Sequence, residues 1–283
     1  MAQNKKKINS EKIYEYIIIG AGPGGLQTGY FLKKFNKDYI ILEKNNNSGS
    51  FFTKYPIHRK LISINKIYNN SDNKDYNLRN DWNSLLSNND KLLMKNYSKE
   101  YFPSADDYVK YLNNFDKFYN LNISYDTEVL KINKYNNIFH IKINNGIIFK
   151  CQKLIISTGL FKMNNLYAEN KNKLIHYKDL NLNKNKFINK KIVIYGNGNS
   201  GFETADYLTD VADVIKIYGK KPVQFAWQTH YVGDLRAVNN NFLDTYQLKS
   251  NNILTEKNFN NEYIINDNDN FDFFINCTGF KID

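Results

Sequence analysis

Apolar runs, glycine-rich turns and helical spacing follow one another at two places in the chain. In the first place, residues 16–19 form an apolar run, residues 26–35 carry apolar positions at helical spacing, and "DYIILEK" forms a second run that ends at Glu43. In the second place, residues 191–196 form the run, residues 200–212 the helical stretch, and "DVIKIYG" the next run. A buried strand, a helix and a further strand predict a βαβ unit, so the pattern predicts an α/β fold with two such units.

The chain between the two units predicts one more helix and a small antiparallel meander. Ser104 is a favourable N-cap residue, and four apolar positions then recur on one helix face: Val109, Leu112, Phe115 and Tyr119. The runs "ISYDTEVLKI", "IFHIKI" and "IIFKC" predict the strands of the meander. A separate apolar strand, "KLIIS", then leads to Thr158 and Gly159.

The first unit has the glycine spacing of a dinucleotide-binding turn. Between its strand and its helix stand five residues that we predict to bind a cofactor: Gly20, Gly22, Pro23, Gly24 and Gly25. Glycine allows a tight turn and a close approach of the backbone to a pyrophosphate at the helix N-terminus. Glu43, followed by Lys44, ends the next strand where ribose hydroxyls would lie. We therefore expect Glu43→Ala to weaken cofactor retention and to leave the fold intact.

The second unit repeats the first turn in the same register but without its acid. The predicted cofactor-binding residues are Gly196, Gly198, Asn199, Ser200 and Gly201. Gly20 to Glu43 and Gly196 to Gly219 are both 23 residues apart, so Gly219 stands where the acid would be. Lys220 and Lys221 follow it, and two cations in place of a carboxylate favour a 2′-phosphate. The second turn is therefore predicted to bind NADPH rather than NADH.

Two Thr-Gly pairs predict how the two units are connected. "KLIISTG" ends at Gly159 and "FDFFINCTG" ends at Gly279, so both appear as strands that return to the first domain. The predicted architecture has two Rossmann-like dinucleotide-binding units, the second (NADPH) inserted into the first (FAD), with a small β-meander. The predicted domains are 12–160 for FAD, 161–275 for NADPH, and 276–283 for a return to the FAD domain that is truncated.

Composition restricts the classes of function. The formal charge is +11, but the lysines are scattered and form no basic stripe with interleaved aromatic residues, so no nucleic-acid partner is expected. No apolar run is long enough for a transmembrane segment, and the start has no apolar signal region, which as written predicts a cytoplasmic protein. Cys151 and Cys277 are the two cysteines, and neither is in a CxxC motif, so no metal site and no disulfide-reducing dithiol is predicted.

Several longer stretches resemble a known family. "SGSFFTKYPIHRKLISINK", "NLRNDWNSLL", "YFPSADDYVKYL", "GNGNSGFETA" and "THYVGDLRAVNNNFLDTYQLKS" resemble the FAD-dependent oxidoreductase domain-containing flavoproteins associated with degradation in the endoplasmic reticulum, within the flavin-containing monooxygenase-like superfamily. The resemblance implies FAD in the first unit, NADPH in the second and a location in the endoplasmic reticulum lumen. It also implies that Asn65 lies beside the flavin and acts in oxygen chemistry.

Three functions are consistent with these residues. The first is an NADPH-dependent flavin oxidoreductase that acts on a small molecule, with or without oxygen. The second is a flavoprotein of protein quality control that passes electrons to a partner protein or binds it. The third is a truncated form with an incomplete FAD site and a structural role. His58 and Arg59 either position the flavin or coenzyme or form a structural hydrogen-bonded pair.

Overall fold

The computed structural model describes residues 12–160, 162–164, 174–244 and 271–281, and they form two compact units. The first unit takes its described residues from Met1–Lys54 and Ser63–Gly159, and the second from Tyr55–Ile62 and Leu160–Asp283. This division differs from the predicted domains 12–160, 161–275 and 276–283, because residues 55–62 and the described residues after 276 cluster with the second unit. Ile57 explains the first difference, since its side chain is part of the second unit's hydrophobic core.

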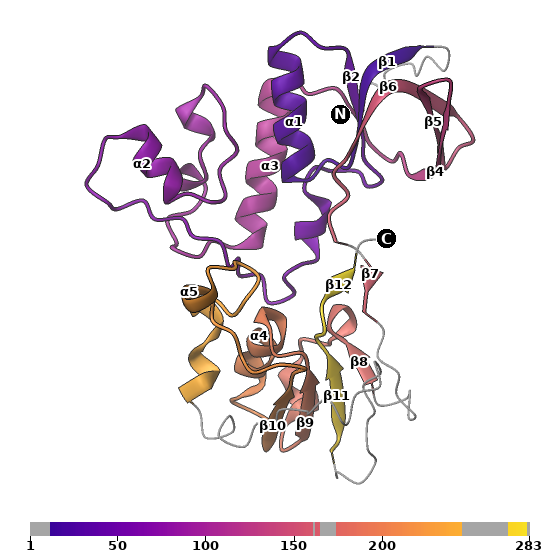
Figure 1. The fold of residues 1–283 in the computed structure, drawn as a ribbon. Helices are drawn as coiled ribbons and strands as arrows, with labels where there is room; N and C mark the ends of the chain where they lie inside the picture. The colour runs from indigo at the N-terminus through magenta and orange to yellow at the C-terminus, as the bar shows by residue number, and fades with distance from the viewer. Residues whose placement is uncertain (1–11, 161, 165–173, 245–270, 282–283) are drawn as a thin grey trace. The chain divides into compact units, whose positions relative to one another are not determined.

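The first unit is built on a six-stranded mixed sheet in the order β3-β2-β1-β6-β5-β4 (Figure 1). Strands β3, β2, β1 and β6 run parallel, and β5 and β4 continue the sheet in antiparallel pairs. The strands are β1 Ile13–Ile19, β2 Tyr39–Leu42, β3 Ile123–Ser124, β4 Val129–Tyr135, β5 Ile138–Ile143 and β6 Ile148–Ile156. The predicted α/β class is confirmed, and the meander is a continuation of the parallel sheet.

Strand β6 joins two strands that the sequence predicts as separate. "IIFKC" and "KLIIS" form one nine-residue strand, which pairs with β1 on one side and with β5 on the other. Its polar middle does not interrupt it, because the Lys153 side chain is exposed and its Nζ donates to Glu15 Oε1 and to the Tyr16 hydroxyl. The exposed lysine is thus compatible with a continuous ladder of backbone hydrogen bonds.

Two long helices, α1 (Pro23–Lys34) and α3 (Ala105–Tyr119), lie side by side beside this sheet (Figure 1). The Ser104 hydroxyl oxygen accepts from the Asp107 N–H at 3.0 Å, which confirms the predicted N-cap. The buried face of α3 differs from the predicted one, because Tyr108 and Tyr111 are buried together with Leu112 and Phe115, whereas Val109 and Tyr119 are only partly buried. Tyr111 is tolerated there because its hydroxyl accepts from Leu85 N and donates to Leu92 O.

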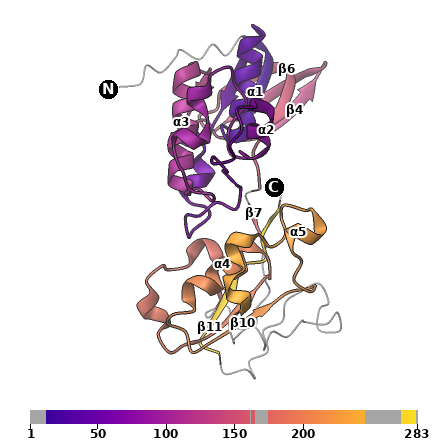
Figure 2. The same cartoon turned by 90° about the vertical axis from the view of Figure 1, so that its left-hand side faces the viewer.

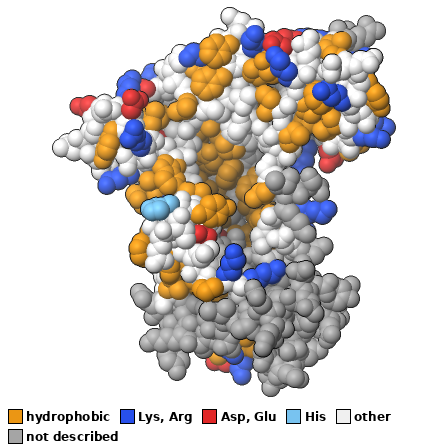
Figure 3. Space-filling model, viewed as in Figure 1, with side chains coloured by type: hydrophobic (Ala, Val, Ile, Leu, Met, Phe, Trp, Pro, Cys, Tyr) orange, Lys and Arg blue, Asp and Glu red, His pale blue; other side chains and the backbone are white. Residues whose placement is uncertain are grey.

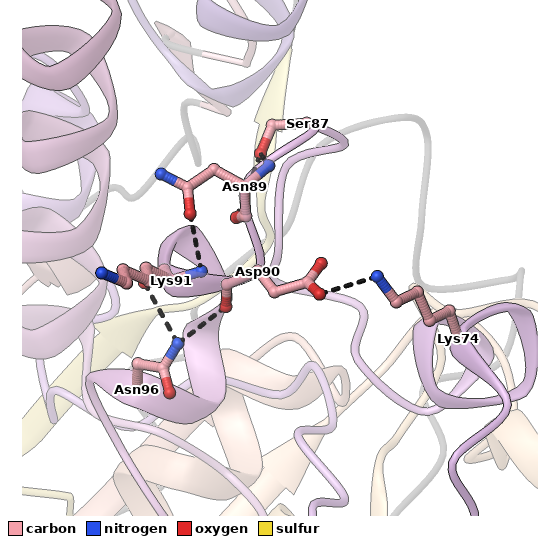
Figure 4. A network of polar contacts seen from close by, with 6 residues as sticks. All are labelled: Lys74, Ser87, Asn89, Asp90, Lys91 and Asn96. Atoms are coloured by element: carbon pink, nitrogen blue, oxygen red, sulfur yellow. Dashed lines mark hydrogen bonds and ion pairs between the residues drawn. The ribbon is translucent and has the colours of Figure 1, made fainter.

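Residues 63–104 form a loop-rich segment of the first unit. Its short helices are α2 (Lys74–Arg79) and the 3₁₀ turns η2 (Asp90–Leu92) and η3 (Met94–Asn96); η1 (Ser50–Thr53) precedes the segment. Figure 4 shows a polar network that holds it: Lys74 Nζ pairs with Asp90 Oδ2 at 2.8 Å, and Asn96 Nδ2 donates to the carbonyls of Asp90 and Lys91. The ion pair is exposed to solvent and therefore contributes little, so the hydrogen bonds from side chains to backbone carbonyls contribute most to holding this segment in place.

The second unit has a four-stranded parallel sheet in the order β10-β9-β11-β8; all four strands are labelled in Figure 1, and Figure 2 shows β10 and β11 in the turned view. Helix α4 (Asn199–Leu208) packs against β9 and β10. The strands are β8 Leu174–His176, β9 Lys191–Tyr195, β10 Val214–Tyr218 and β11 Phe273–Asn276, with β7 Lys162–Met163 and β12 Phe280–Lys281 as a short antiparallel pair. The remaining elements are η5 Tyr177–Asp179, η6 Lys184–Phe187, α5 Ala226–Thr229, η7 Ala237–Asn239 and η8 Asn241–Asp244.

One face of the molecule shows how the charged side chains are distributed. On the face drawn in Figure 3, the Lys and Arg side chains of the described residues are scattered among apolar, uncharged and acidic ones and do not form a continuous stripe. Among the described helices, none is long and apolar enough to cross a membrane.

Candidate functional site

The two glycine turns have the same backbone geometry. Gly20 has φ +100° and Gly196 has φ +105°, a region that favours glycine. A Cβ on Gly20 would lie 2.6 Å from the Ser157 carbonyl oxygen, and a Cβ on Gly196 would lie 2.3 Å from that of Cys277. The third glycines are equally restricted, because a Cβ on Gly25 or on Gly201 would lie 1.9 or 2.0 Å from the carbonyl oxygen of the first glycine in the same turn.

The middle glycines differ from these because they face open space. A Cβ on Gly22 or on Gly198 would meet nothing within 4 Å, and both residues are the N-caps of their helices without a side-chain hydrogen bond. The first turn of α1, which begins at Pro23, Gly24 and Gly25, contains no acid, and neither does that of α4. An open backbone beside the N–H groups of a helix N-terminus fits the pyrophosphate of a dinucleotide.

Glu43 follows β2 and is buried, with four hydrogen bonds to its carboxylate. Oε2 accepts from the Ala21 N–H at 2.8 Å, and Oε1 accepts from the backbone and side-chain amides of Asn45 and from the Ser50 hydroxyl. Oε2 has one partner and so retains acceptor capacity for a ribose hydroxyl. The expectation that Glu43→Ala leaves the fold intact conflicts with this network, because the substitution removes the acceptor of two backbone donors. Lys44, next to it, is exposed.

Gly219 occupies the position in the second unit that Glu43 occupies in the first, and there the side chain comes from the glycine turn and not from the strand end. A Cβ on Gly219 would lie 2.1 Å from Asn197 Cγ, so the Asn197 side chain occupies the space that an acid at 219 would need. Asn197 Nδ2 donates to the carbonyl oxygen of Lys221 at 2.7 Å. Lys220 and Lys221 have exposed side chains at this end of β10. The strand end therefore presents ammonium groups and an amide and no carboxylate.

Asn199 has a structural role in addition to its place in the turn. Its Nδ2 donates to the carbonyls of Gly233 and Asp234, and its Oδ1 accepts from the Arg236 N–H and from Asn239 Nδ2. All hydrogen-bonding positions of this amide are used, so Asn199 offers a ligand its backbone only. Ser200, the next residue, is partly exposed.

Asn65, the predicted catalytic residue, is buried in the first unit. Its Nδ2 donates to the carbonyls of Ser98 and Glu100, at 2.9 and 3.3 Å. Its Oδ1 is buried and has no hydrogen-bond partner among the described residues. The amide therefore has an unused acceptor, whereas its Nδ2 already donates to two backbone carbonyls.

Each Thr-Gly pair follows the strand beside its glycine turn. Gly159 and Gly279 have φ +66° and +89°, and a Cβ on Gly159 would meet nothing within 4 Å. Thr158 is exposed. In the second unit Asn276 holds the pair, because its Oδ1 accepts from the N–H and the hydroxyl of Thr278. The predicted similarity of the two closures is therefore present in the backbone.

No motif in the sequence indicates the buried cluster that lies below α4. Tyr177 donates its hydroxyl to Glu203 Oε2 at 3.1 Å and accepts from the Ile57 N–H. Burial raises the pKa of Glu203 to about 7, opposed by hydrogen bonds from Tyr177 and from the His58 backbone. Burial, with Lys184 nearby, lowers the pKa of His58 to about 4. Arg59, predicted to bind a cofactor, lies beside His58 with φ +64°, and its guanidinium donates to the Pro56 carbonyl.

The two cysteines are buried and lie in different units. Burial raises the pKa of Cys151 to about 11 and that of Cys277 to about 12, so both are neutral thiols at physiological pH. Among the described residues, no group of three or more His, Cys, Asp or Glu side chains could hold a metal ion.

Comparison with known proteins agrees with this geometry. A family model described as pyridine nucleotide-disulphide oxidoreductase matches residues 17–283. The chain belongs to the pyridine nucleotide-disulphide oxidoreductase family. It is 47% identical over 241 residues to FAD-dependent oxidoreductase domain-containing protein 2 of Danio rerio, covering 84% of this chain and 35% of that protein. The Mus musculus protein of the same name is 40% identical over 243 residues, covering 83% and 36%.

These two relatives confirm the resemblance that the sequence motifs indicate. The chain spans about a third of their length. Solved structures show the same fold at low identity. A flavin-containing monooxygenase from Stenotrophomonas maltophilia superposes with a TM-score of 0.73 at 18% identity, over 96% of this chain and 79% of that one. The bacillithiol disulfide reductase of Staphylococcus aureus gives 0.68 at 20%, over 96% and 78%. The chain therefore has two Rossmann-like units, as predicted from its sequence.

Proposed function

We propose that this chain is an FAD-dependent oxidoreductase that uses NADPH, with FAD at the Gly20 turn and the nicotinamide coenzyme at the Gly196 turn. The observation that supports this best is the pairing of two like turns, each with an open middle glycine at a helix N-terminus, whose strand ends carry opposite charge. The names of the relatives support FAD. A steroid monooxygenase solved with bound NADP, which superposes with a TM-score of 0.55 at 16% identity, supports the second coenzyme.

The residues of the first unit bind and orient the FAD. The first turn of α1 would receive the pyrophosphate, and Glu43, held by Ala21, Asn45 and Ser50, would offer the remaining acceptor capacity of Oε2 to a ribose hydroxyl. The unused Oδ1 of Asn65 accepts a hydrogen bond from an N–H group of the cofactor. Bound FAD supplies the acceptor for a hydride from the reduced coenzyme.

The residues of the second unit select the coenzyme. The first turn of α4 receives the pyrophosphate, and Asn197 keeps the end of β10 free of a carboxylate. Lys220 and Lys221 then attract the 2′-phosphate of NADPH. With neither cysteine in a dithiol, electrons leave the chain towards a small molecule, oxygen or a partner protein and not through an internal disulfide.

The visible spectrum of the purified 283-residue chain tests this function. We expect a flavin spectrum after reconstitution with FAD and bleaching by NADPH without oxygen. A preparation that stays colourless with added FAD would disprove the proposal, and a flavin that NADPH does not bleach would disprove its coenzyme. Hydrogen peroxide release per NADPH, in wild type and Asn65→Asp, then tests the role of Asn65 in oxygen chemistry.

A role in protein quality control, and a location in the endoplasmic reticulum lumen, stay predictions from the resemblance. So does the suggestion that the FAD site is incomplete within residues 12–160 and 276–283. Comparing the FAD affinity of this chain with that of a form extended as in the longer relatives would test the last point, since equal affinities would show that these residues suffice.

A further inference from the structure

The buried cluster below α4 contains two polar atoms that lack partners. Four side chains from three segments meet there: His58 from residues 55–62, Tyr177 from η5, and Glu203 and Thr204 from α4. Glu203 Oε1 and His58 Nδ1 are buried, and neither has a hydrogen-bond partner among the described residues. Such atoms are rare in a folded interior and each needs an explanation.

The hydrogen bonds of Thr204 determine which ring nitrogen of neutral His58 carries the proton. The Thr204 hydroxyl donates to the Ser200 carbonyl at 2.8 Å, so it can only accept from the His58 Nε2, which lies 3.4 Å from it. The proton of neutral His58 is therefore on Nε2, and Nδ1 has a bare lone pair. An ionised Glu203 would add a second acceptor to the same cluster, whereas a protonated Glu203 supplies a donor.

Glu203 also lies close to the coenzyme turn. It is four residues after Asn199, the first residue of α4, which is about one helical turn or about 6 Å along the axis. A pyrophosphate at that N-terminus places negative charge near the carboxyl group. Like charge disfavours the ionised form of an acid.

The corresponding residue of the first unit shows the contrast. Gln27 stands seven residues after Gly20, as Glu203 stands seven after Gly196. The Gln27 amide is satisfied, because Oε1 accepts from the Leu86 N–H and Nε2 donates to the Leu86 carbonyl. The threonines that follow are the same, since Thr28 donates to the Gly24 carbonyl as Thr204 does to that of Ser200. A titratable group with an unused atom is therefore particular to the second helix.

We propose that Glu203 is a proton-binding site coupled to the coenzyme turn, so that coenzyme binding at α4 is accompanied by uptake of one proton from solvent onto the Glu203 carboxylate. The proposal rests on the proposed function, which places the coenzyme pyrophosphate at α4. Tyr177 of η5 and the backbone of His58 act on Glu203. Glu203 in turn acts on Cys277, which follows β11, and Lys184 of η6 acts on His58. In the protein without coenzyme the pKa of Glu203 is about 7, so this proton uptake is measurable near neutral pH.

Proton uptake on NADP⁺ binding tests the proposal. Titration calorimetry of the full chain in two buffers of different ionisation enthalpy gives the protons bound per NADP⁺ between about pH 6 and 8.5. Glu203→Gln keeps the shape but cannot titrate, and Asp206→Asn on the exposed side of α4 is the matched control. With a pKa shift of about one unit, wild type and Asp206→Asn take up about half a proton more than Glu203→Gln near pH 7.5. Subtracting the Glu203→Gln value removes the protons bound by the 2′-phosphate itself.

Each outcome decides the proposal. Equal uptake in wild type and Glu203→Gln, with NADP⁺ bound by both, overturns the proton site and leaves the proposed function standing. No NADP⁺ binding by wild type overturns the coenzyme assignment and the proton site together. If Glu203→Gln does not fold, Tyr177→Phe replaces it: loss of the hydroxyl that donates to Oε2 moves the uptake maximum to higher pH, and an unchanged maximum overturns the proposal.

Discussion

The two glycine turns have the same backbone geometry, but different side chains connect each turn to the end of its neighbouring strand. In the first unit the Glu43 side chain extends from the strand end back to the turn and binds the Ala21 N–H. In the second unit the Asn197 side chain extends from the turn to the strand end, where it binds the Lys221 carbonyl above Gly219. Ala21 and Asn197 occupy the same place in their turns, between the first two glycines. The residue between the glycines therefore determines whether an acid fits at the strand end.

Asn197 explains why position 219 is a glycine. Taken by itself, the missing acid at Gly219 indicates only that a ribose contact is lost. The structure adds that the Asn197 side chain fills the space that a larger residue at 219 would need. Identical glycine spacing thus fixes the path of the backbone, and the neighbouring side chains determine the charge that a ligand meets.

The largest effects are expected at the glycines that both turns share. Gly25→Ala and Gly201→Ala place a Cβ 1.9 or 2.0 Å from a backbone carbonyl oxygen, so each should destabilise its own unit by about 3 kcal/mol or more. Urea unfolding of the two variants measures this. Gly22→Ala and Gly198→Ala are the controls, because their Cβ atoms meet nothing. The controls should change stability by less than about 1 kcal/mol and weaken binding of FAD and NADP⁺, respectively. Equal losses of stability at middle and third glycines would contradict the shared geometry.

The sequence predicts the backbone of both units better than their side-chain networks. The βαβ units and the Ser104 cap follow from local periodicity and turn chemistry, which depend on neighbouring residues. The Glu203 cluster escapes such reasoning, because its members come from residues 55–62, η5 and α4, and only folding brings them together. The same holds for the continuous β6 strand and for the buried face of α3, where Tyr111 is buried with its hydroxyl group hydrogen-bonded.

Glu43→Ala tests the side-chain network at the strand end of the first unit. It leaves the Ala21 and Asn45 backbone N–H groups without their acceptor, so we expect a loss of about 2 to 3 kcal/mol in stability as well as weaker FAD retention. Denaturant unfolding and flavin content after dialysis measure the two effects. Gly219→Ala is the counterpart in the second unit and should cost less, since it displaces only the end of the Asn197 side chain. Full stability with full flavin content in Glu43→Ala would show that the network is dispensable.

Glu203→Gln gives the second helix the residue of the first and should change how stability depends on pH. The folded pKa of Glu203, about 7, lies above its ordinary value, so its contribution to stability is present at low pH and is lost as the pH rises towards and through 7. Wild type should therefore lose about 2 kcal/mol relative to Glu203→Gln between about pH 4.5 and 7.5. The lowered pKa of His58 acts in the opposite direction, since its contribution is lost as the pH falls towards 4, but it is common to both proteins. Parallel stability curves from thermal unfolding would contradict the raised pKa.

Replacing Lys220 and Lys221 together with Ala tests the charge at the second strand end. Each ammonium group attracts a 2′-phosphate that has no carboxylate to repel it, while NADH offers no phosphate there. The double variant should lose about tenfold in its preference for NADPH over NADH, or about 1.4 kcal/mol, with flavin reduction by NADH nearly unchanged. Anaerobic flavin reduction by each coenzyme measures the ratio, and Lys216→Ala, which removes a lysine within β10, is the matched control. An unchanged ratio would mean that the lysines are solvated bystanders, and the difference between the two turns would then lie in Asn197 and Glu43 alone.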